Sequence, residues 1–122
     1  MQLGFVGLGK MGLNMVTRLI QGGHEIVAFD RNAEVVAKAE TIGATGVRSL
    51  DALVATLQGP RAVWVMVPSG DPTEQTVVAL STLLGNGDVI IDGGNTHFHD
   101  DVRRADALKA SGIEYVDAGT SG

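Results

Sequence analysis

The sequence predicts an α/β fold in which about six parallel strands form one doubly wound sheet with helices on both faces. Three observations support this fold class. Short apolar runs alternate along the 122 residues with segments that carry apolar residues at helical spacing. The apolar runs are nearly continuous, as expected for strands covered on both faces. The 17 glycines show no repeat period and indicate many tight turns.

The elements follow one another without a linker, so residues 1–122 are predicted to form a single domain. Gly22 and Gly23 end the first helix, and Asn32 and Ser49 are expected to cap the second and third. Asp71 followed by Pro72 suits the start of the fourth. The predicted strands are 2–6, 25–29, 46–48, 62–67, 89–91 and 114–116. Helices are expected over 11–21 and about 96–110. The second helix contains Val35, Val36 and Ala39 and ends before Gly43, and the third has Leu50, Leu53, Val54 and Leu57 on its inner face.

Apolar side chains define the inner faces of these helices. The first carries Met11, Met15, Val16, Leu19 and Ile20, and the fourth carries Val77, Val78, Leu80, Leu83 and Leu84. Right-handed crossovers between the strands then place a ligand crevice at the carboxyl ends of the strands.

Composition excludes several classes of function. The net charge of −5 without a basic cluster argues against a nucleic-acid partner. No run approaches the roughly 20 apolar residues of a membrane span, and the amino terminus does not resemble a signal peptide. The chain lacks cysteine, and no side chains have metal-ligand spacing. We therefore expect a cytoplasmic protein without a metal or a membrane partner.

The first strand runs into a GxGxxG motif formed by Gly7, Leu8, Gly9, Lys10, Met11 and Gly12. In this context the first glycine allows a tight turn, the second lets a pyrophosphate approach, and the third lets helix and strand pack closely. Free N–H groups of the helix then face the phosphates. The motif therefore predicts a dinucleotide-binding Rossmann fold, and a glycine-rich turn without a ligand is the alternative.

Asp30 ends the second strand, at the position of the carboxylate that takes the ribose hydroxyls and repels a 2′-phosphate. This position favours NAD over NADP. Arg31 is either a solvated cation or a group that accepts a phosphate or stacks on adenine. Glycine-containing loops at 67–70, 92–95 and 119–122 follow three further strands and converge on the same crevice. Asn95 alone could equally be a helix cap.

Together, GLGKMG, FDRN, VWVMVPSG, IDGGN and VDAGTSG resemble the N-terminal domain of the 6-phosphogluconate dehydrogenases, within the β-hydroxyacid dehydrogenase superfamily. The resemblance covers essentially the whole chain. IDGGN is the more specific motif, since 3-hydroxyisobutyrate dehydrogenases usually have a serine-containing turn there. FDRN is similar to the smaller, NAD-preferring branch of the family.

The resemblance implies a set of binding residues. The pyrophosphate would bind Leu8 to Gly12, and Pro68 stands where the family usually has a lysine. Asn95 would serve both cofactor and sugar acid. The implied cofactor-binding residues are Gly7, Leu8, Gly9, Lys10, Met11, Gly12, Asp30, Arg31, Asn32, Val67, Pro68, Ser69 and Asn95, and the implied substrate-binding residues are Asn95, Ser121 and Gly122.

It also implies an activity, the oxidative decarboxylation of 6-phosphogluconate to ribulose 5-phosphate. The general-base Lys and the acid Glu are expected beyond Gly122, as is the helical domain that completes the substrate site and forms a homo-oligomer. The 122-residue chain is therefore expected to bind NAD weakly and to catalyse nothing. Two alternatives stay open, another hydroxyacid dehydrogenase such as one for 3-hydroxyisobutyrate, and a non-catalytic module that senses dinucleotides.

Overall fold

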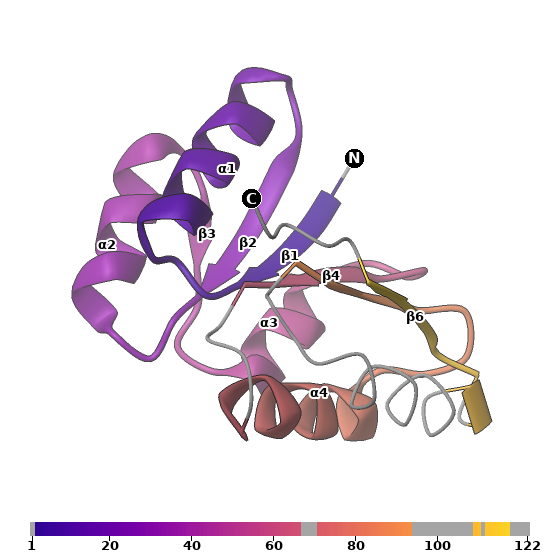
Figure 1. The fold of residues 1–122 in the computed structure, drawn as a ribbon. Coiled ribbons are helices and arrows are strands. Elements are labelled where there is room, and N and C mark those ends of the chain that lie inside the picture. Colours follow the sequence, from indigo (N-terminus) through magenta and orange to yellow (C-terminus); the bar gives the residue numbers. More distant parts are fainter. Residues whose placement is uncertain (1, 67–70, 94–108, 111, 118–122) are drawn as a thin grey trace.

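The structure, a computed structural model, describes residues 2–66, 71–93, 109–110 and 112–117. Its strands form one parallel sheet in the order β3-β2-β1-β4-β5-β6, which confirms the predicted doubly wound arrangement (Figure 1). The order reverses between β1 and β4, and this reversal opens a crevice at the carboxyl edge of such sheets. The strands are β1 (Gln2–Val6), β2 (Glu25–Phe29), β3 (Thr45–Gly46), β4 (Ala62–Val65), β5 (Val89–Asp92) and β6 (Glu114–Asp117).

Helices cover both faces of the sheet, as predicted (Figure 1). Two of them pack against one face and two against the other, so the core has two layers. The described helices are α1 (Lys10–Gln21) and α2 (Ala33–Ile42) on one face, and α3 (Leu50–Thr56) and α4 (Asp71–Leu83) on the other. The predicted helix over 96–110 lies outside the described residues except for 109–110, which are helical.

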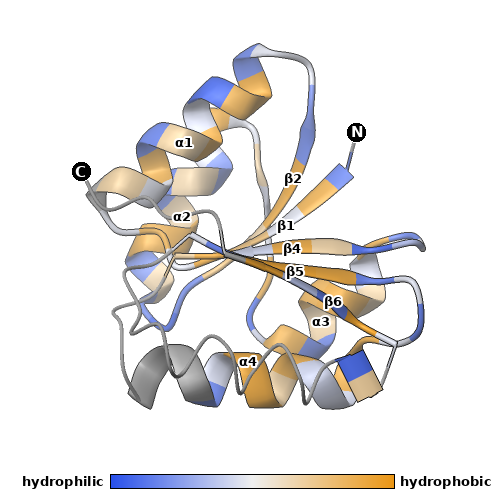
Figure 2. Cartoon of the chain, turned by 45° about the vertical axis from the view of Figure 1, so that its right-hand side comes forward, coloured by the Kyte–Doolittle hydropathy of each residue, from blue (hydrophilic) through white to orange (hydrophobic). Residues whose placement is uncertain are grey.

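Alternating side chains of the central strands supply both core layers. Phe5 of β1 packs towards α1 and α2, whereas Val6 packs towards α3 and α4. The central strands β4 and β5 are mostly hydrophobic, and α1 alternates hydrophobic with hydrophilic residues (Figure 2). This pattern is the one expected where a helix buries one side against a sheet.

Two predicted helix caps are confirmed. The Asn32 side chain accepts a hydrogen bond from the Glu34 amide at 2.9 Å, and the Ser49 hydroxyl accepts one from Ala52 at 3.0 Å. Each bond satisfies an N–H group that the helix itself leaves without a partner. The caps fix where α2 and α3 begin, and with them the ends of β2 and β3.

Several boundaries differ from the sequence-based expectation. β4 ends at Val65 rather than 67, and β3 covers Thr45–Gly46 rather than 46–48. Beyond β3, the Val47 amide still donates to the Ala28 carbonyl at 3.0 Å, and Ser49 then caps α3.

Two side chains assigned to inner helix faces are in fact 54% exposed, Met11 and Val78. Met11 lies in the first turn of α1, within the GxGxxG motif. Val78 follows the buried Val77 by one residue, which is about 100° around a helix.

At the amino edge of the sheet, Asp88 joins the starts of β4 and β5. Its carboxylate accepts bonds from the Arg61 amide at 2.7 Å and the Gly85 amide at 2.8 Å, and it forms a 2.9 Å ion pair with the Arg61 guanidinium. Burial alone would raise the pKa of Asp88, but the Gly85 and Arg61 hydrogen bonds and the Arg61 charge outweigh it and leave that pKa below its usual value. The ionised carboxylate therefore stabilises the fold.

Among the described helices, none has the length and apolar character that crossing a membrane requires.

Candidate dinucleotide-binding site

The glycine loop, Gly7 to Gly12, connects β1 to α1 in a conformation that needs its glycines. Gly7 has a φ of +97°, which L-residues with a side chain rarely adopt. A Cβ at Gly12 would come closer than 3.0 Å to the Gly7 carbonyl oxygen and within 3.3 Å of the Phe5 ring. Gly12 therefore allows the first turn of α1 to pack directly on the loop.

Gly9 is the N-cap of α1 and faces open space, since a Cβ there would meet nothing within 4 Å. The first bond inside the helix runs from the Leu13 amide to the Gly9 carbonyl at 2.9 Å. The N–H groups of the first turn have no partner within the helix, and Gly9 offers no side chain to cap them. Open space in front of free amides fits a phosphate group.

Asp30 follows the last residue of β2 and lies beside the glycine loop. Its Oδ2 accepts a 2.7 Å hydrogen bond from the Leu8 amide, and its Oδ1 accepts a 2.9 Å bond from the Asn32 amide. A carboxylate has about four acceptor positions, so both oxygens can also accept from ribose hydroxyls. The structure thus places Asp30 where the sequence predicted it, and adds two bonds that the sequence did not predict.

Arg31 extends from the end of β2 towards α4. Its Nη2 lies 3.4 Å from Oε1 of Gln75, and both side chains are exposed. This exposed contact leaves the guanidinium accessible to a ligand in the crevice. Asn32 uses its side chain to cap α2, so its oxygen has a structural task as well.

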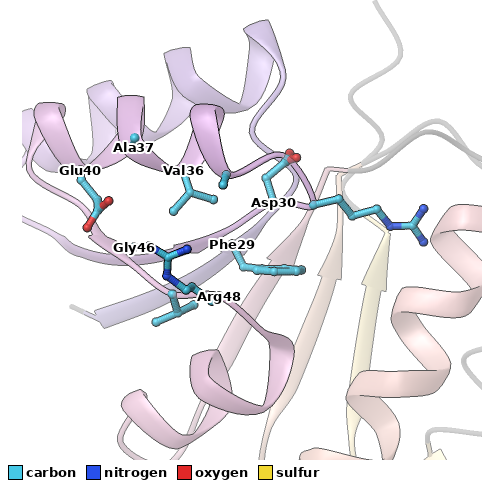
Figure 3. Close-up of a pocket in the computed structure, with 10 residues that line it drawn as sticks. Phe29, Asp30, Val36, Ala37, Glu40, Gly46 and Arg48 are labelled. Atoms are coloured by element: carbon cyan, nitrogen blue, oxygen red, sulfur yellow. The ribbon is translucent and has the colours of Figure 1, made fainter.

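A cavity of about 350 Å³ opens next to Asp30, between α2 and the end of β3. Asp30 lies at one end, Glu40 and Arg48 lie at the other, and the Phe29 ring lies between them (Figure 3). The cavity therefore has an apolar floor with charges of both signs on its rim. Its lining residues are Phe29, Asp30, Arg31, Ala33, Val36, Ala37, Glu40, Gly46, Val47 and Arg48.

The end of β5 carries a fully buried carboxylate, Asp92. Tyr115 of β6 donates its hydroxyl to Oδ2 of Asp92 at 2.5 Å. Gly93 follows, and its backbone is so close to the Trp64 indole that a Cβ could not fit between them. The Trp64 N–H is buried and has no hydrogen-bond partner in the described part of the chain. These contacts hold the end of β5 and Gly93, the residue that follows it.

Six predicted site residues lie outside the described residues. The strands that lead to them do end at one edge, because Val65, Asp92 and Asp117 are register partners in β4, β5 and β6. The six residues are Val67, Pro68, Ser69, Asn95, Ser121 and Gly122.

Sequence reasoning missed three contributors to this edge, namely Gln75, Tyr115 and the Leu8 amide as a partner of Asp30. A Tyr in the strand next to the IDGGN motif was a usable signal for a buried carboxylate partner. Gln75 lies on an exposed helix position, which no local pattern singles out. The Leu8–Asp30 bond joins residues 22 positions apart.

Comparison with known proteins agrees with this geometry. The profile of the NAD binding domain of 6-phosphogluconate dehydrogenase matches residues 2–122. The chain belongs to this family. Within the 6-phosphogluconate dehydrogenases, the NAD(+)-dependent, decarboxylating enzyme of Haloferax volcanii is 48% identical over the whole chain, which spans 40% of that relative's length.

Solved structures show the same fold. A 3-hydroxyisobutyrate dehydrogenase from Mycobacterium tuberculosis superimposes with a TM-score of 0.89 at 25% identity, over 99% of this chain and 40% of that one. A Plasmodium falciparum 6-phosphogluconate dehydrogenase gives 0.84 at 26% identity, over 94% of this chain and 26% of that one. The domain therefore has the same backbone fold as the matching parts of these two dehydrogenases.

Proposed function

We propose that this chain is the cofactor-binding part of an NAD-dependent, decarboxylating 6-phosphogluconate dehydrogenase. Such an enzyme oxidises 6-phosphogluconate at C3 and releases CO₂ to give ribulose 5-phosphate. The observation that carries the proposal is the carboxylate of Asp30 at the end of β2, held directly beside the glycine loop. The name of the H. volcanii relative, NAD(+)-dependent, supports the same choice of cofactor.

The residues of this chain would bind and orient the dinucleotide. Amides of the first turn of α1 would hold the pyrophosphate, and Asp30 would accept hydrogen bonds from the adenosine ribose hydroxyls. The negative charge of Asp30 would also repel a 2′-phosphate, which favours NAD over NADP. When bound, the nicotinamide supplies the hydride acceptor, and the protein supplies its position.

The assignment of the substrate-binding residues rests on the resemblance to the family, and these residues lie outside the described part of the chain. We propose that Val67, Pro68 and Ser69 line the cofactor, and that Asn95 contacts both the cofactor and the sugar acid. Ser121 and Gly122 would begin the substrate-binding Ser-Gly-Gly. The general-base Lys, the acid Glu and the interface of a cytoplasmic homo-oligomer would come from chain beyond Gly122.

Titration calorimetry of the 122-residue chain with NAD and with NADP tests the cofactor assignment. We expect weak binding of NAD and at least about 10-fold weaker binding of NADP, equivalent to the loss of one charge-assisted hydrogen bond. Gly9→Val tests the phosphate site. It should weaken NAD binding, because the valine side chain would fill the open space in front of α1. Equal affinities for the two nucleotides, or unchanged NAD affinity in Gly9→Val, would contradict the proposal.

A second candidate is a dehydrogenase of another hydroxyacid, because the M. tuberculosis 3-hydroxyisobutyrate enzyme has such a similar backbone. The full-length protein, incubated with NAD and either 6-phosphogluconate or 3-hydroxyisobutyrate, separates the two. We expect NADH formation with 6-phosphogluconate and none from the 122-residue chain alone. Turnover of 3-hydroxyisobutyrate in preference would favour the second candidate, and turnover by the short chain would refute the assignment of catalysis to later residues.

A further inference from the structure

Both oxygens of the Asp30 carboxylate accept a backbone hydrogen bond before any ligand is considered. One oxygen accepts from the Asn32 amide, two residues along the chain, and the other accepts from the Leu8 amide, 22 residues away. Hydrogen bonds to an ionised acceptor are shorter and stronger than neutral ones, and the 2.7 Å bond to Leu8 has that character. This second bond joins the glycine loop to the β2–α2 turn.

Leu8 and the preceding residue, Gly7, make further contacts that fix the loop. The Leu8 side chain is completely buried, in the core layer under α1 and α2 that also contains Phe5 and Val16. The Gly7 amide donates to the Phe29 carbonyl at 3.0 Å. Gly7 has positive φ, so the loop turns sharply at the point where β2 holds it. The path of the loop is therefore set by the end of β2.

This arrangement changes which amides are free for a phosphate. The Leu8 N–H points to Asp30, so the pyrophosphate must use the amides of the first turn of α1. The direction of those amides depends on the loop that Asp30 holds. Loss of the carboxylate would therefore disturb the phosphate site itself, in addition to removing a partner of the ribose.

We propose that Asp30 is a positioning residue that holds the glycine loop in its binding conformation through the Leu8 amide, in addition to any contact with ribose. The proposal rests on the proposed function for its effect on dinucleotides, but the bond itself exists without a ligand. A carboxylate that acted only on ribose would weaken NAD binding when removed and strengthen NADP binding. A positioning carboxylate weakens both when it is removed.

The test compares Asp30→Ala and Asp30→Asn with wild type in the 122-residue chain, using amide hydrogen exchange by NMR and calorimetry with each nucleotide. Without nucleotide, we expect the Leu8 amide of Asp30→Ala to exchange at least about 10-fold faster than in wild type. The same variant should bind NAD and NADP each about 10-fold more weakly or worse. Asp30→Asn keeps one acceptor oxygen, so its Leu8 exchange rate and its nucleotide affinities should lie between those of wild type and Asp30→Ala.

Asp51→Asn is the matched control, because it removes the same charge from an exposed residue in the first turn of α3. It should leave Leu8 exchange and both affinities unchanged. Unchanged Leu8 exchange in Asp30→Ala, or weaker NAD binding with stronger NADP binding, would overturn the proposal. Loss of folding in Asp30→Ala, with folding retained in Asp30→Asn, would support the proposal. A carboxylate that only contacted ribose would have no effect on folding in the absence of nucleotide. If wild type binds neither nucleotide, the proposed function fails, and Leu8 exchange still decides the positioning role.

Discussion

Replacing Gly12 by alanine tests whether α1 must pack directly on the glycine loop. The new Cβ would come closer than 3.0 Å to the Gly7 carbonyl oxygen, a backbone atom that cannot rotate away as a side chain can. Overpacking of this kind costs about 1–3 kcal/mol, and alanine recovers up to about 1 kcal/mol through its higher helix propensity. Because the close contact is with a backbone atom, the upper part of this range applies, about 2–3 kcal/mol. After the gain in helix propensity, we expect a net loss of about 1–2 kcal/mol in the free energy of unfolding.

Urea denaturation followed by the fluorescence of Trp64, the single tryptophan, measures this loss. Phe5, which Gly12 approaches, stacks on the Trp64 ring, so the probe lies close to the change. Gly9→Ala is the control, since its Cβ has open space and loses at most about 1 kcal/mol of capping preference. Both variants should bind NAD more weakly. A Gly12→Ala protein as stable as wild type would refute the close packing.

Three further changes test contacts elsewhere in the domain. Asp88→Asn should lower the free energy of unfolding by about 1–3 kcal/mol, because it removes the ionised partner of Arg61 and of two amides. The folded-state pKa of Asp88 is lowered, so its contribution is present above its unfolded pKa of about 3.9 and is lost as the pH falls through the folded value. Urea titrations should therefore show a smaller difference between wild type and Asp88→Asn at about pH 3 than at about pH 6, and an equal difference would contradict this. Tyr115→Phe should cost about 1–3 kcal/mol, since it withdraws a donor from the buried Asp92, and a smaller loss would mean that water replaces the hydroxyl. Asn32→Ala should cost about 1 kcal/mol as a lost helix cap, measured by thermal unfolding, with unchanged stability as the contrary result.

The architecture was predictable because its signals are local. Apolar runs, caps such as Asn32 and Ser49, and the GxGxxG motif each act over a few residues, and chirality rules then order the strands. Periodicity was wrong for Met11 and Val78, because hydrophobicity alone does not show which neighbours a helix residue has. The extent of β3 depends on its pairing with β2, a contact between residues far apart in the sequence.

The residues of the candidate site could be predicted from the sequence, but most of the hydrogen bonds between them could not. Asp30 could be placed from the length of a βαβ unit, which brings the end of β2 beside the glycine loop. The choice of the Leu8 amide as its partner depends on side-chain direction, which sequence spacing does not fix. Asp88 was missed because an acidic residue before an apolar strand is common in loops, and only burial beside Arg61 distinguishes it.

Asp88 and Asp30 lie at opposite edges of the sheet, so the contact that stabilises the fold is separated from the nucleotide site. Asp88 joins the amino ends of β4 and β5, whereas Asp30 stands at the carboxyl edge with the glycine loop. Substitutions that strengthen the amino edge can therefore raise thermal tolerance while leaving the nucleotide crevice in place. Substitutions that alter cofactor choice belong at the carboxyl edge. Stabilising substitutions at the amino edge can offset the stability that those changes remove.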